Sequence, residues 1–298
     1  MNNNTVACGD LHVGKKHKVT YGDPTIWNDL PLKVLSNLIK TEKPTLLILD
    51  GDVFDSSRPT ALDFARLVSV VAVVDEVYIL TGNHDLSMLV EEIAFQHLNN
   101  IPNITIIQAN EYDYMPDGSI GVGWCDTQEK FEHIMAMAIS SAPMGGTIHA
   151  HCNRKYWEND NDNSFTDALY EMARDKEIIV YSGHEHTASV SKHFVHLGSV
   201  VPQASNQVGD KYYLHNGELK RLPNHASIYE EDQADLYFLK DEPLNIRDNA
   251  CYMVRVEKEI KPEDLKLEGK DLTIDIIESF KEAALKEGFS KELLNEYI

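Results

Sequence analysis

Short apolar runs alternate with amphipathic stretches along most of the chain. Apolar runs typical of buried strands cover residues 5–8, 46–49, 77–80, 104–107, 120–125, 147–151 and 178–181. Stretches with helical periodicity separate several of these runs, at residues 27–41, 60–74, 86–98, 128–139 and 165–174. The run at 46–49 is apolar throughout, as in a parallel strand that is covered on both faces. The pattern therefore predicts an α/β fold with parallel strands.

The pattern changes after residue 186. Residues 190–197 and 211–222 alternate in hydrophobicity and predict antiparallel strands, and Asn216-Gly217 gives the second stretch the signal of a tight hairpin. Further on, residues 251–256 read as an edge strand and residues 272–287 as an amphipathic helix. We therefore expect a catalytic domain of residues 1–225 and a small α+β extension of residues 226–298 that caps it or binds a partner.

Four of the expected strands end in a glycine that is followed by side chains with oxygen or nitrogen donors. These segments are Gly9-Asp10-Leu11-His12, Gly51-Asp52-Val53-Phe54-Asp55, Gly82-Asn83-His84-Asp85 and Gly183-His184-Glu185-His186. Such groups pack poorly, because each needs a partner when it is buried. A helix cap at Asn83 or Asp85 would explain one segment alone. Ligands bind beyond the carboxyl ends of strands in open α/β sheets, so we expect all four segments to converge at one edge.

Together these side chains form a donor set for two divalent cations. A two-metal site for displacement at phosphorus needs a bridging carboxylate with nitrogen and oxygen ligands on each side. The candidate ligands are Asp10, His12, Asp52, Asn83, His184 and His186, with Asp52 as the bridge. Mixed carboxylate, amide and imidazole ligation suits Mn, Fe, Zn or Ni better than Ca.

One imidazole is missing from this set, and two histidines compete for the place. His151 stands at the very end of its expected strand and should reach the open edge, whereas His149 lies two residues back and should sit deeper. We take His151 as the ligand and keep His149 as the alternative.

These motifs, in this order, resemble the calcineurin-like metallophosphoesterase superfamily. Within it the chain is most similar to SbcD-type nuclease subunits of DNA repair and recombination, phage forms included, through residues 9–14, residues 51–55 and Arg58-Pro59. Ser56 stands where relatives of the protein serine/threonine phosphatases would carry an arginine. The resemblance spans residues 5–200 and implies a four-layer α/β/β/α sandwich.

The resemblance also implies a role for each candidate residue. One cation would be held by Asp10, His12 and His186 and the other by Asn83, His151 and His184, and Asp52 would bridge them. His84 would be a catalytic imidazole that stabilises the phosphoryl transition state or protonates the leaving oxygen, with Asp85 orienting it. The expected cofactor is a pair of divalent ions, Mn first, with Fe, Zn and Ni as alternatives.

The expected function is hydrolysis of DNA phosphodiester bonds, as the nuclease subunit of an SbcCD-like exonuclease. The helical segment 272–298 resembles the part that such subunits offer to an SbcC-like ATPase, although it would equally serve as a brace on its own domain. Cys152 follows His151 where glycine is commoner in the superfamily, which is a departure from its pattern. A phosphatase or phosphodiesterase for nucleotides or other small phosphate esters is the alternative, and a homodimer is left open.

Charge and composition limit these expectations. The net charge is −21, which favours bound cations and opposes broad electrostatic binding of nucleic acid. Local help for a phosphate could come from Lys15, Lys16, His17 and Lys18, unless they form a solvated loop. The apolar stretches are too short to cross a bilayer, and the four cysteines are scattered, so we expect a cytoplasmic protein with reduced thiols and no membrane contact.

Overall fold

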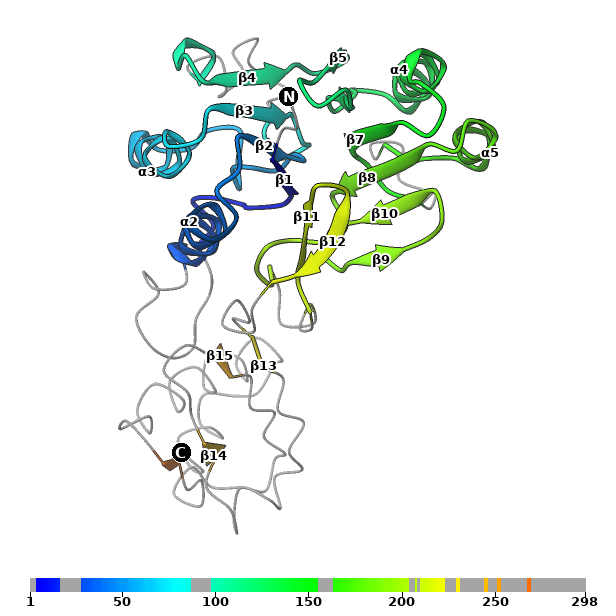
Figure 1. Ribbon diagram of the computed structural model, residues 1–298. Helices are drawn as coiled ribbons and strands as arrows, with labels where there is room; N and C mark the ends of the chain where they lie inside the picture. The colour runs from blue at the N-terminus through cyan, green and yellow to red at the C-terminus, as the bar shows by residue number, and fades with distance from the viewer. Residues whose placement is uncertain are drawn as a thin grey trace, which may run out of the picture.

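The computed structural model describes residues 4–16, 28–86, 98–154, 163–203, 207 and 210–222 (Figure 1). It also describes four two-residue strands further on, which are β13 (Tyr229–Glu230), β14 (Leu244–Asn245), β15 (Cys251–Tyr252) and β16 (Leu267–Glu268). The pairs β13·β15 and β14·β16 are both parallel. Most of the expected C-terminal extension, including the helix at 272–287, lies outside the described residues, so the domain boundary stays a prediction.

The first sheet has six strands in the order β12-β11-β1-β2-β3-β4. Its parallel strands are β1 (Thr5–Cys8), β2 (Leu46–Leu49), β3 (Glu76–Leu80) and β4 (Ile104–Ile107). The hairpin of β11 (Tyr212–His215) and β12 (Glu218–Arg221) joins it through an antiparallel pairing of β11 with β1. Helices α2 (Leu30–Glu42) and α3 (Ala61–Val71) connect the parallel strands, and a capping box between Thr60 and Asp63 begins α3.

The second sheet also has six strands, in the order β5-β6-β7-β8-β10-β9. These are β5 (Tyr112–Tyr114), β6 (Ile120–Val122), β7 (Thr147–His151), β8 (Ile179–Gly183), β9 (Ser189–Val190) and β10 (Phe194–His196). The neighbours β6, β7, β8 and β10 run parallel, and the two edge strands β5 and β9 are antiparallel to them. Helices α4 (Gln128–Ser141) and α5 (Asp167–Asp175) accompany this sheet.

Three apolar cores hold the layers together. One packs α2 and α3 on the first sheet, a second packs α4 and α5 on the second sheet, and the third lies between the two sheets. Ile48 and Leu80 of the first sheet and Tyr181 and Val195 of the second belong to this central core. Figure 1 shows the helices on the two outer faces, so the predicted α/β/β/α sandwich is confirmed. No helix among the described residues is both long and apolar enough to cross a membrane.

Two local predictions differ from the structure. Residues 190–197 were expected to form one strand, but they form β9 and β10, because Ser191 makes a turn in which its N–H and hydroxyl both donate to the Phe194 carbonyl. The expected strand at 120–125 ends at Val122, after which the Trp124 N–H donates to Thr81 in the other sheet. The helix expected at 86–98 lies outside the described residues except at its two ends.

Candidate metal centre

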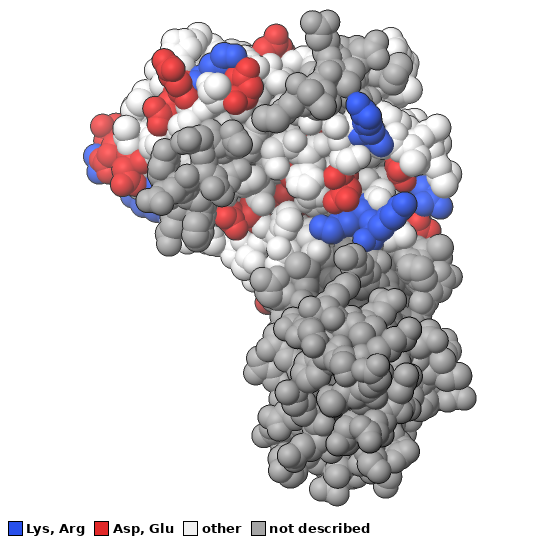
Figure 2. Space-filling model, turned by 180° about the vertical axis from the view of Figure 1, so that it is seen from behind, with Lys and Arg blue, Asp and Glu red and all other residues white. Residues whose placement is uncertain are grey.

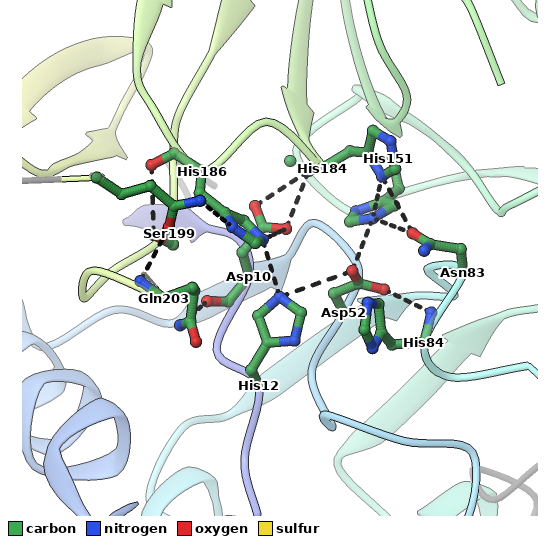
Figure 3. Close-up of polar contacts among 12 residues, drawn as sticks. Asp10, His12, Asp52, Asn83, His84, His151, His184, His186, Ser199 and Gln203 are labelled. Atoms are coloured by element: carbon green, nitrogen blue, oxygen red, sulfur yellow. Dashed lines mark hydrogen bonds and ion pairs between the residues drawn. The ribbon is translucent and has the colours of Figure 1, made fainter. Parts of the chain in front are cut away.

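The candidate ligands gather where the carboxyl ends of strands from both sheets meet (Figure 3). The first sheet supplies Asp10, His12, Asp52 and Asn83 from the loops after β1, β2 and β3. The second supplies His151 at the end of β7, and His184 and His186 after β8. All seven predicted ligands are therefore brought together, from segments far apart in the sequence.

Backbone hydrogen bonds align the loops after β1 and β2. The N–H of Asp10 donates to the Gly51 carbonyl at 3.2 Å, and the N–H of His12 donates to the Asp52 carbonyl at 2.9 Å. The parallel pairing of the two strands thus continues past their ends. It places the side chains of the two loops side by side.

Several site residues have a left-handed backbone. Eight non-glycine residues have positive φ among the described residues, and four of them are Asp10 (52°), His12 (47°), Asp52 (47°) and His184 (78°). Such conformations cost energy and persist where the surrounding contacts hold them. Half of these left-handed residues lie at the site, which indicates that contacts there hold the backbone so that the side chains take these positions.

The first group of donors consists of Asp10, His12 and His186. The Nε2 atoms of the two histidines lie 3.0 Å apart, and His186 Nε2 lies 3.8 Å from Asp10 Oδ1. The Asp10 carboxylate also accepts the N–H of His184, at 3.0 Å from each oxygen. Asp10 and His12 are buried, and His186 is half-buried.

The second group consists of Asp52, Asn83, His151 and His184. Asn83 Oδ1 lies 3.2 Å from His151 Nε2 and 3.0 Å from His184 Nδ1. Asp52 Oδ2 lies 3.3 Å from His151 Nε2 and also 3.7 Å from Nε2 of His12 in the first group. Asp52 therefore stands between the two groups, where the predicted bridge belongs.

The donor set fits a pair of divalent cations. In the groups Asp10–His12–His186 and Asp52–His151–His184, one donor atom per residue lies within 4.8 Å of the others. A third group of the same kind joins His12 and Asp52 to His84. Among the described residues neither Asp10 nor Asp52 pairs with a lysine or arginine, although both carboxylates are buried. Buried carboxylates need opposite charge, and mixed N and O donors suit transition metals.

The electrostatics of the site prepare most of its imidazoles for ligation. Burial and neighbouring histidines lower the pKa of His184 and of His186 to about 3, so both rings are neutral and carry free lone pairs. Burial alone would lower the pKa of His151, but the Asp52 and Asp10 carboxylates raise it to about 10. Burial raises the pKa of Asp10 to about 7, helped by the nearby Asp52 charge. Without metal, protons thus partly neutralise this cluster.

Nδ1 of His151 and Nδ1 of His12 each lie close to an oxygen of a neighbouring aspartate. His151 Nδ1 lies 2.8 Å from the Asp50 carbonyl oxygen, which orients Nε2 towards Asp52 and Asn83. His12 Nδ1 lies 3.3 Å from Asp55 Oδ1 without the alignment of a hydrogen bond, so that contact is electrostatic.

The loop that carries His186 is fastened from the region after β10. The side-chain nitrogen of Gln207 lies 3.0 Å from His186 Nδ1. The Lys211 ammonium group donates to the His186 carbonyl at 3.0 Å and to the Ser199 hydroxyl at 3.3 Å. Burial lowers the pKa of Lys211 to about 8. Gln203 similarly donates to the Asp10 carbonyl at 3.3 Å.

His84 lies at the exposed rim of the site. Its ring centroid is 4.8 Å from that of His12, and its Nδ1 lies 2.8 Å from the Asp55 carbonyl oxygen. Its backbone N–H donates to Asp52 Oδ1 at 2.9 Å, which leaves Oδ2 of that carboxylate facing the histidines. The position suits the catalytic role that the sequence suggested, which itself stays a prediction.

Asp85, which the sequence suggested as the group that orients His84, makes its hydrogen bonds to the backbone, and the suggested role stays a prediction. The buried Asp85 carboxylate accepts backbone N–H groups of Gly82 and Phe54, at 2.9 Å and 3.0 Å. It therefore ties the loop after β3 to the loop after β2. The His84 ring itself contacts the Asp55 carbonyl oxygen through Nδ1.

The structure places the two competing histidines of β7 at different depths. His151 reaches the donor groups, whereas His149 lies beneath them with its Nδ1 at 3.0 Å from Asp50 Oδ1. Of the basic residues near the start, Lys15 lies 3.9 Å from Asp55 Oδ1, and Lys16 is exposed. His17 and Lys18 lie outside the described residues.

Sequence reasoning missed the supporting residues of the site. Asp50 had a signal, since a carboxylate that directly follows the apolar run 46–49 must find a buried partner. Asp55 belonged to a recognised motif without a role of its own. Gln207 and Lys211 carry no local signal, because His186, which both contact, lies more than twenty residues away.

Comparisons with known proteins agree with this geometry. The family model described as calcineurin-like phosphoesterase matches residues 4–196. No curated protein matches the chain in sequence. Among solved structures, 86 chains match.

Three of the matching structures illustrate the low sequence identity. TT1561 of Thermus thermophilus is 10% identical with a TM-score of 0.46, over 74% of this chain and 98% of that one. A putative 5′-nucleotidase from Staphylococcus aureus is 12% identical with a TM-score of 0.41, over 65% of this chain and 48% of that one. The calcineurin-like phosphoesterase YfkN from Bacillus subtilis is 14% identical with a TM-score of 0.40, over 74% and 87%.

Proposed function

The chain belongs to the calcineurin-like phosphoesterase family, and we propose that it is a two-metal phosphodiesterase that hydrolyses DNA. One observation carries the hydrolytic part of the proposal. Seven donor side chains from both sheets, with Asp52 among them, meet at one place, and the exposed imidazole of His84 lies beside them. A metal-assisted displacement at a phosphodiester requires metal ligands of this kind and a group that can transfer a proton.

The chain's own residues define the site in which the reaction would occur. Asp10, His12 and His186 would hold one divalent cation, Asn83, His151 and His184 would hold the other, and Asp52 would contact both. Bound there, divalent cations supply Lewis acidity that polarises a phosphoryl oxygen and activates water. The low pKa values of His184 and His186 keep these rings available as neutral ligands.

His84 is the residue that can move a proton at the rim. The Asp55 carbonyl can only accept a hydrogen bond, so Nδ1 of His84 carries hydrogen. Nε2 is then the atom that gains or releases a proton. From this position it can donate to a phosphoryl or leaving oxygen.

DNA as substrate is supported by the motifs rather than by the charge. Residues 9–14, residues 51–55 and Arg58-Pro59 resemble those of SbcD-type nuclease subunits of repair and recombination. The net charge of −21 instead favours the second candidate, a phosphatase or phosphodiesterase for nucleotides or other small phosphate esters. On the face that Figure 2 shows, acidic and basic side chains are interspersed over the described part of the chain.

A substrate comparison separates the two candidates. The purified chain would be freed of metal, reloaded with Mn²⁺, and given plasmid DNA, hairpin DNA, bis-p-nitrophenyl phosphate and p-nitrophenyl phosphate in parallel. We expect both DNA forms and the diester to be cleaved, and all cleavage to stop with chelator. Cleavage of the small esters alone would favour the second candidate. A chain that binds two cations and cleaves none of the four would contradict both.

We further propose an SbcC-like ATPase as the partner, contacted through residues 272–298. The proposal is supported by the resemblance of this segment to the partner-binding part of such nuclease subunits, and the segment lies outside the described residues. Copurification of the chain with a coiled-coil ATPase from the same source, compared with a chain that ends at residue 271, tests it. A homodimer would be seen as a doubled mass in the same experiment.

A further inference from the structure

The two sheets meet at a buried seam beneath the metal centre. Gly9 and Gly51 line it from the first sheet and Gly183 from the second. A Cβ on Gly183 would lie 2.3 Å from the Asp50 carbonyl oxygen, and a Cβ on Gly9 would lie 3.2 Å from the Gly183 Cα. At these glycines the backbones of the two sheets are therefore in direct contact, and no side chain would fit at these positions.

A carboxylate and an imidazole are joined across this seam. Asp50 directly follows β2 of the first sheet, His149 lies in β7 of the second, and their exposed fractions are 0% and 1%. His149 Nδ1 lies 3.0 Å and 3.1 Å from the two carboxylate oxygens. Tyr181 stacks on the imidazole with 5.6 Å between ring centroids. The pair is thus enclosed within the central core, away from solvent.

A buried pair of this kind affects the geometry of the fold as well as its packing. Removing a charged group from water is costly, and apolar side chains of similar volume often replace a buried ion pair without loss of stability. A hydrogen bond, however, fixes direction as well as distance. The Asp50–His149 hydrogen bond therefore favours the one register between the sheets in which its two partners meet.

The register matters because each residue of the pair lies two positions before a candidate ligand. Asp52 follows Asp50 in the first sheet, and His151 follows His149 in the second. Asp50 contacts β7 twice, with its carboxylate at His149 and with its carbonyl at His151 Nδ1, at 2.8 Å. Any shift between β2 and β7 would therefore change the 3.3 Å separation of Asp52 Oδ2 and His151 Nε2.

We propose that Asp50 and His149 form a positioning pair that sets the spacing of the two sheets, so that Asp52 and His151 meet at one cation. Neither residue is among the candidate ligands, and both act through the residues two places on. The inference rests on the proposed function only because it requires a cation bound by Asp52 and His151. It does not depend on DNA being the substrate.

Binding of Mn²⁺ alone to the full, metal-free chain tests the pair. Asp50→Leu and His149→Leu each remove the hydrogen bond, and we expect the affinity for one of the two cations to fall about 10- to 100-fold in a calorimetric titration. Asp50→Asn keeps an oxygen that accepts from His149 Nδ1, and we expect its Mn²⁺ affinity to stay close to that of the parent chain. This rescue separates hydrogen bonding from mere volume.

His193→Leu is a matched control in the same sheet. His193 is also a buried histidine, with its Nδ1 at 3.0 Å from the Ile178 carbonyl oxygen, but it packs towards Tyr170 of α5. Its loss should lower the thermal stability of the metal-free chain and leave the Mn²⁺ affinity unchanged. Thermal unfolding in chelator shows which variants are folded. The double variant Asp50→Leu/His149→Leu leaves neither partner buried without its hydrogen bond. If a single variant does not fold, the Mn²⁺ affinity of the double variant is measured in its place, and the same fall is expected.

Two results would overturn the proposal. One is parent-like binding of both cations by the folded leucine variants, and the other is binding by Asp50→Asn that is as weak as that of Asp50→Leu. A parent chain that binds two Mn²⁺ ions but leaves DNA intact would instead contradict the proposed substrate. The role of the pair is still decided by the Mn²⁺ titrations in that case.

Discussion

His84 is exposed, whereas the candidate ligands are buried or half-buried. We expect His84→Ala to lower kcat on bis-p-nitrophenyl phosphate about 10²- to 10⁴-fold, because the variant loses a general acid. The donor atoms of both cation groups remain in place, so two metal ions per chain should still bind. Steady-state kinetics and metal analysis of the same preparation measure both quantities.

Asp52→Ala is the contrasting variant at the same scale. It removes the carboxylate that stands between the two donor groups, so metal content and turnover should be lost together. Normal turnover by His84→Ala, or full metal content in Asp52→Ala, would contradict the roles assigned to these residues.

Proton release on metal uptake is a second prediction from single residues. Without metal, the Asp52 and Asp10 charges outweigh burial and raise the pKa of His151 to about 10, and burial raises the pKa of Asp10 to about 7. A cation must displace these protons, so affinity should rise with pH up to the pKa of His151. His184 and His186, with pKa values of about 3, are already neutral and should release none.

Calorimetry in two buffers of different ionisation enthalpy counts these protons. At a pH between the two raised pKa values we expect a net release when Mn²⁺ binds. Metal affinity that is independent of pH over this interval would show that the cation does not replace the proton on His151.

At the scale of elements, the strands that the sequence predicted best are the ones buried on both faces. The run 46–49 coincides with β2, and a continuous apolar run of this length is typical of a parallel strand that is covered on both faces. β5 was missed because its three residues are mostly exposed at an edge and show no apolar pattern. β9 was merged with β10 because the turn between them depends on hydrogen bonds of Ser191 that carry no hydrophobic signal.

The donor residues were predictable for a similar reason. Each lies at the end of a buried strand or just after it, and the ends of parallel strands share one edge, so local sequence is enough to predict that they gather. The residues that support the site, by contrast, depend on contacts between loops that are distant in the sequence. Asp85 shows the difference, because its position next to His84 suggested an interaction, while its carboxylate binds the backbone of Phe54 and Gly82.

The loop after β2 should tolerate no side chain at Gly51. This residue has φ of +86°, and a Cβ on it would lie 2.3 Å from His151 Nδ1. Gly51→Ala should therefore cost about 1–2 kcal/mol in backbone strain and, in addition, displace His151 from the cation site. Gly118→Ala is the matched control, because Gly118 has φ of +88° and nothing within 4 Å of the added Cβ.

We expect both alanine variants to lose thermal stability, and only Gly51→Ala to lose Mn²⁺ affinity. Equal Mn²⁺ affinity in the two variants would mean that the approach of the Gly51 backbone to His151 has no part in metal binding.

At the scale of the whole molecule, the metal centre is a joint between the two halves of the sandwich. Each donor group takes residues from both sheets, with Asp10 and His12 facing His186 in the first and Asp52 facing His151 in the second. The chain also carries a net charge of −21, and repulsion among its carboxylates opposes the compact state. Cations bound at this joint would reduce that repulsion and link the two sheets.

Metal binding should therefore stabilise the fold as a whole. A ligand that binds only the folded state adds about 2.7 kcal/mol to the free energy of unfolding when its free concentration is 100 times its Kd. Thermal unfolding of the metal-free chain should shift upwards as Mn²⁺ is added, and the transition should stay single because both sheets hold each cation. Asp52→Ala, which lacks the shared carboxylate, should show little shift over the same range. If Mn²⁺ instead split the transition of the parent chain in two, the cations would be stabilising one sheet alone, and the centre would not be the joint that its donor atoms describe.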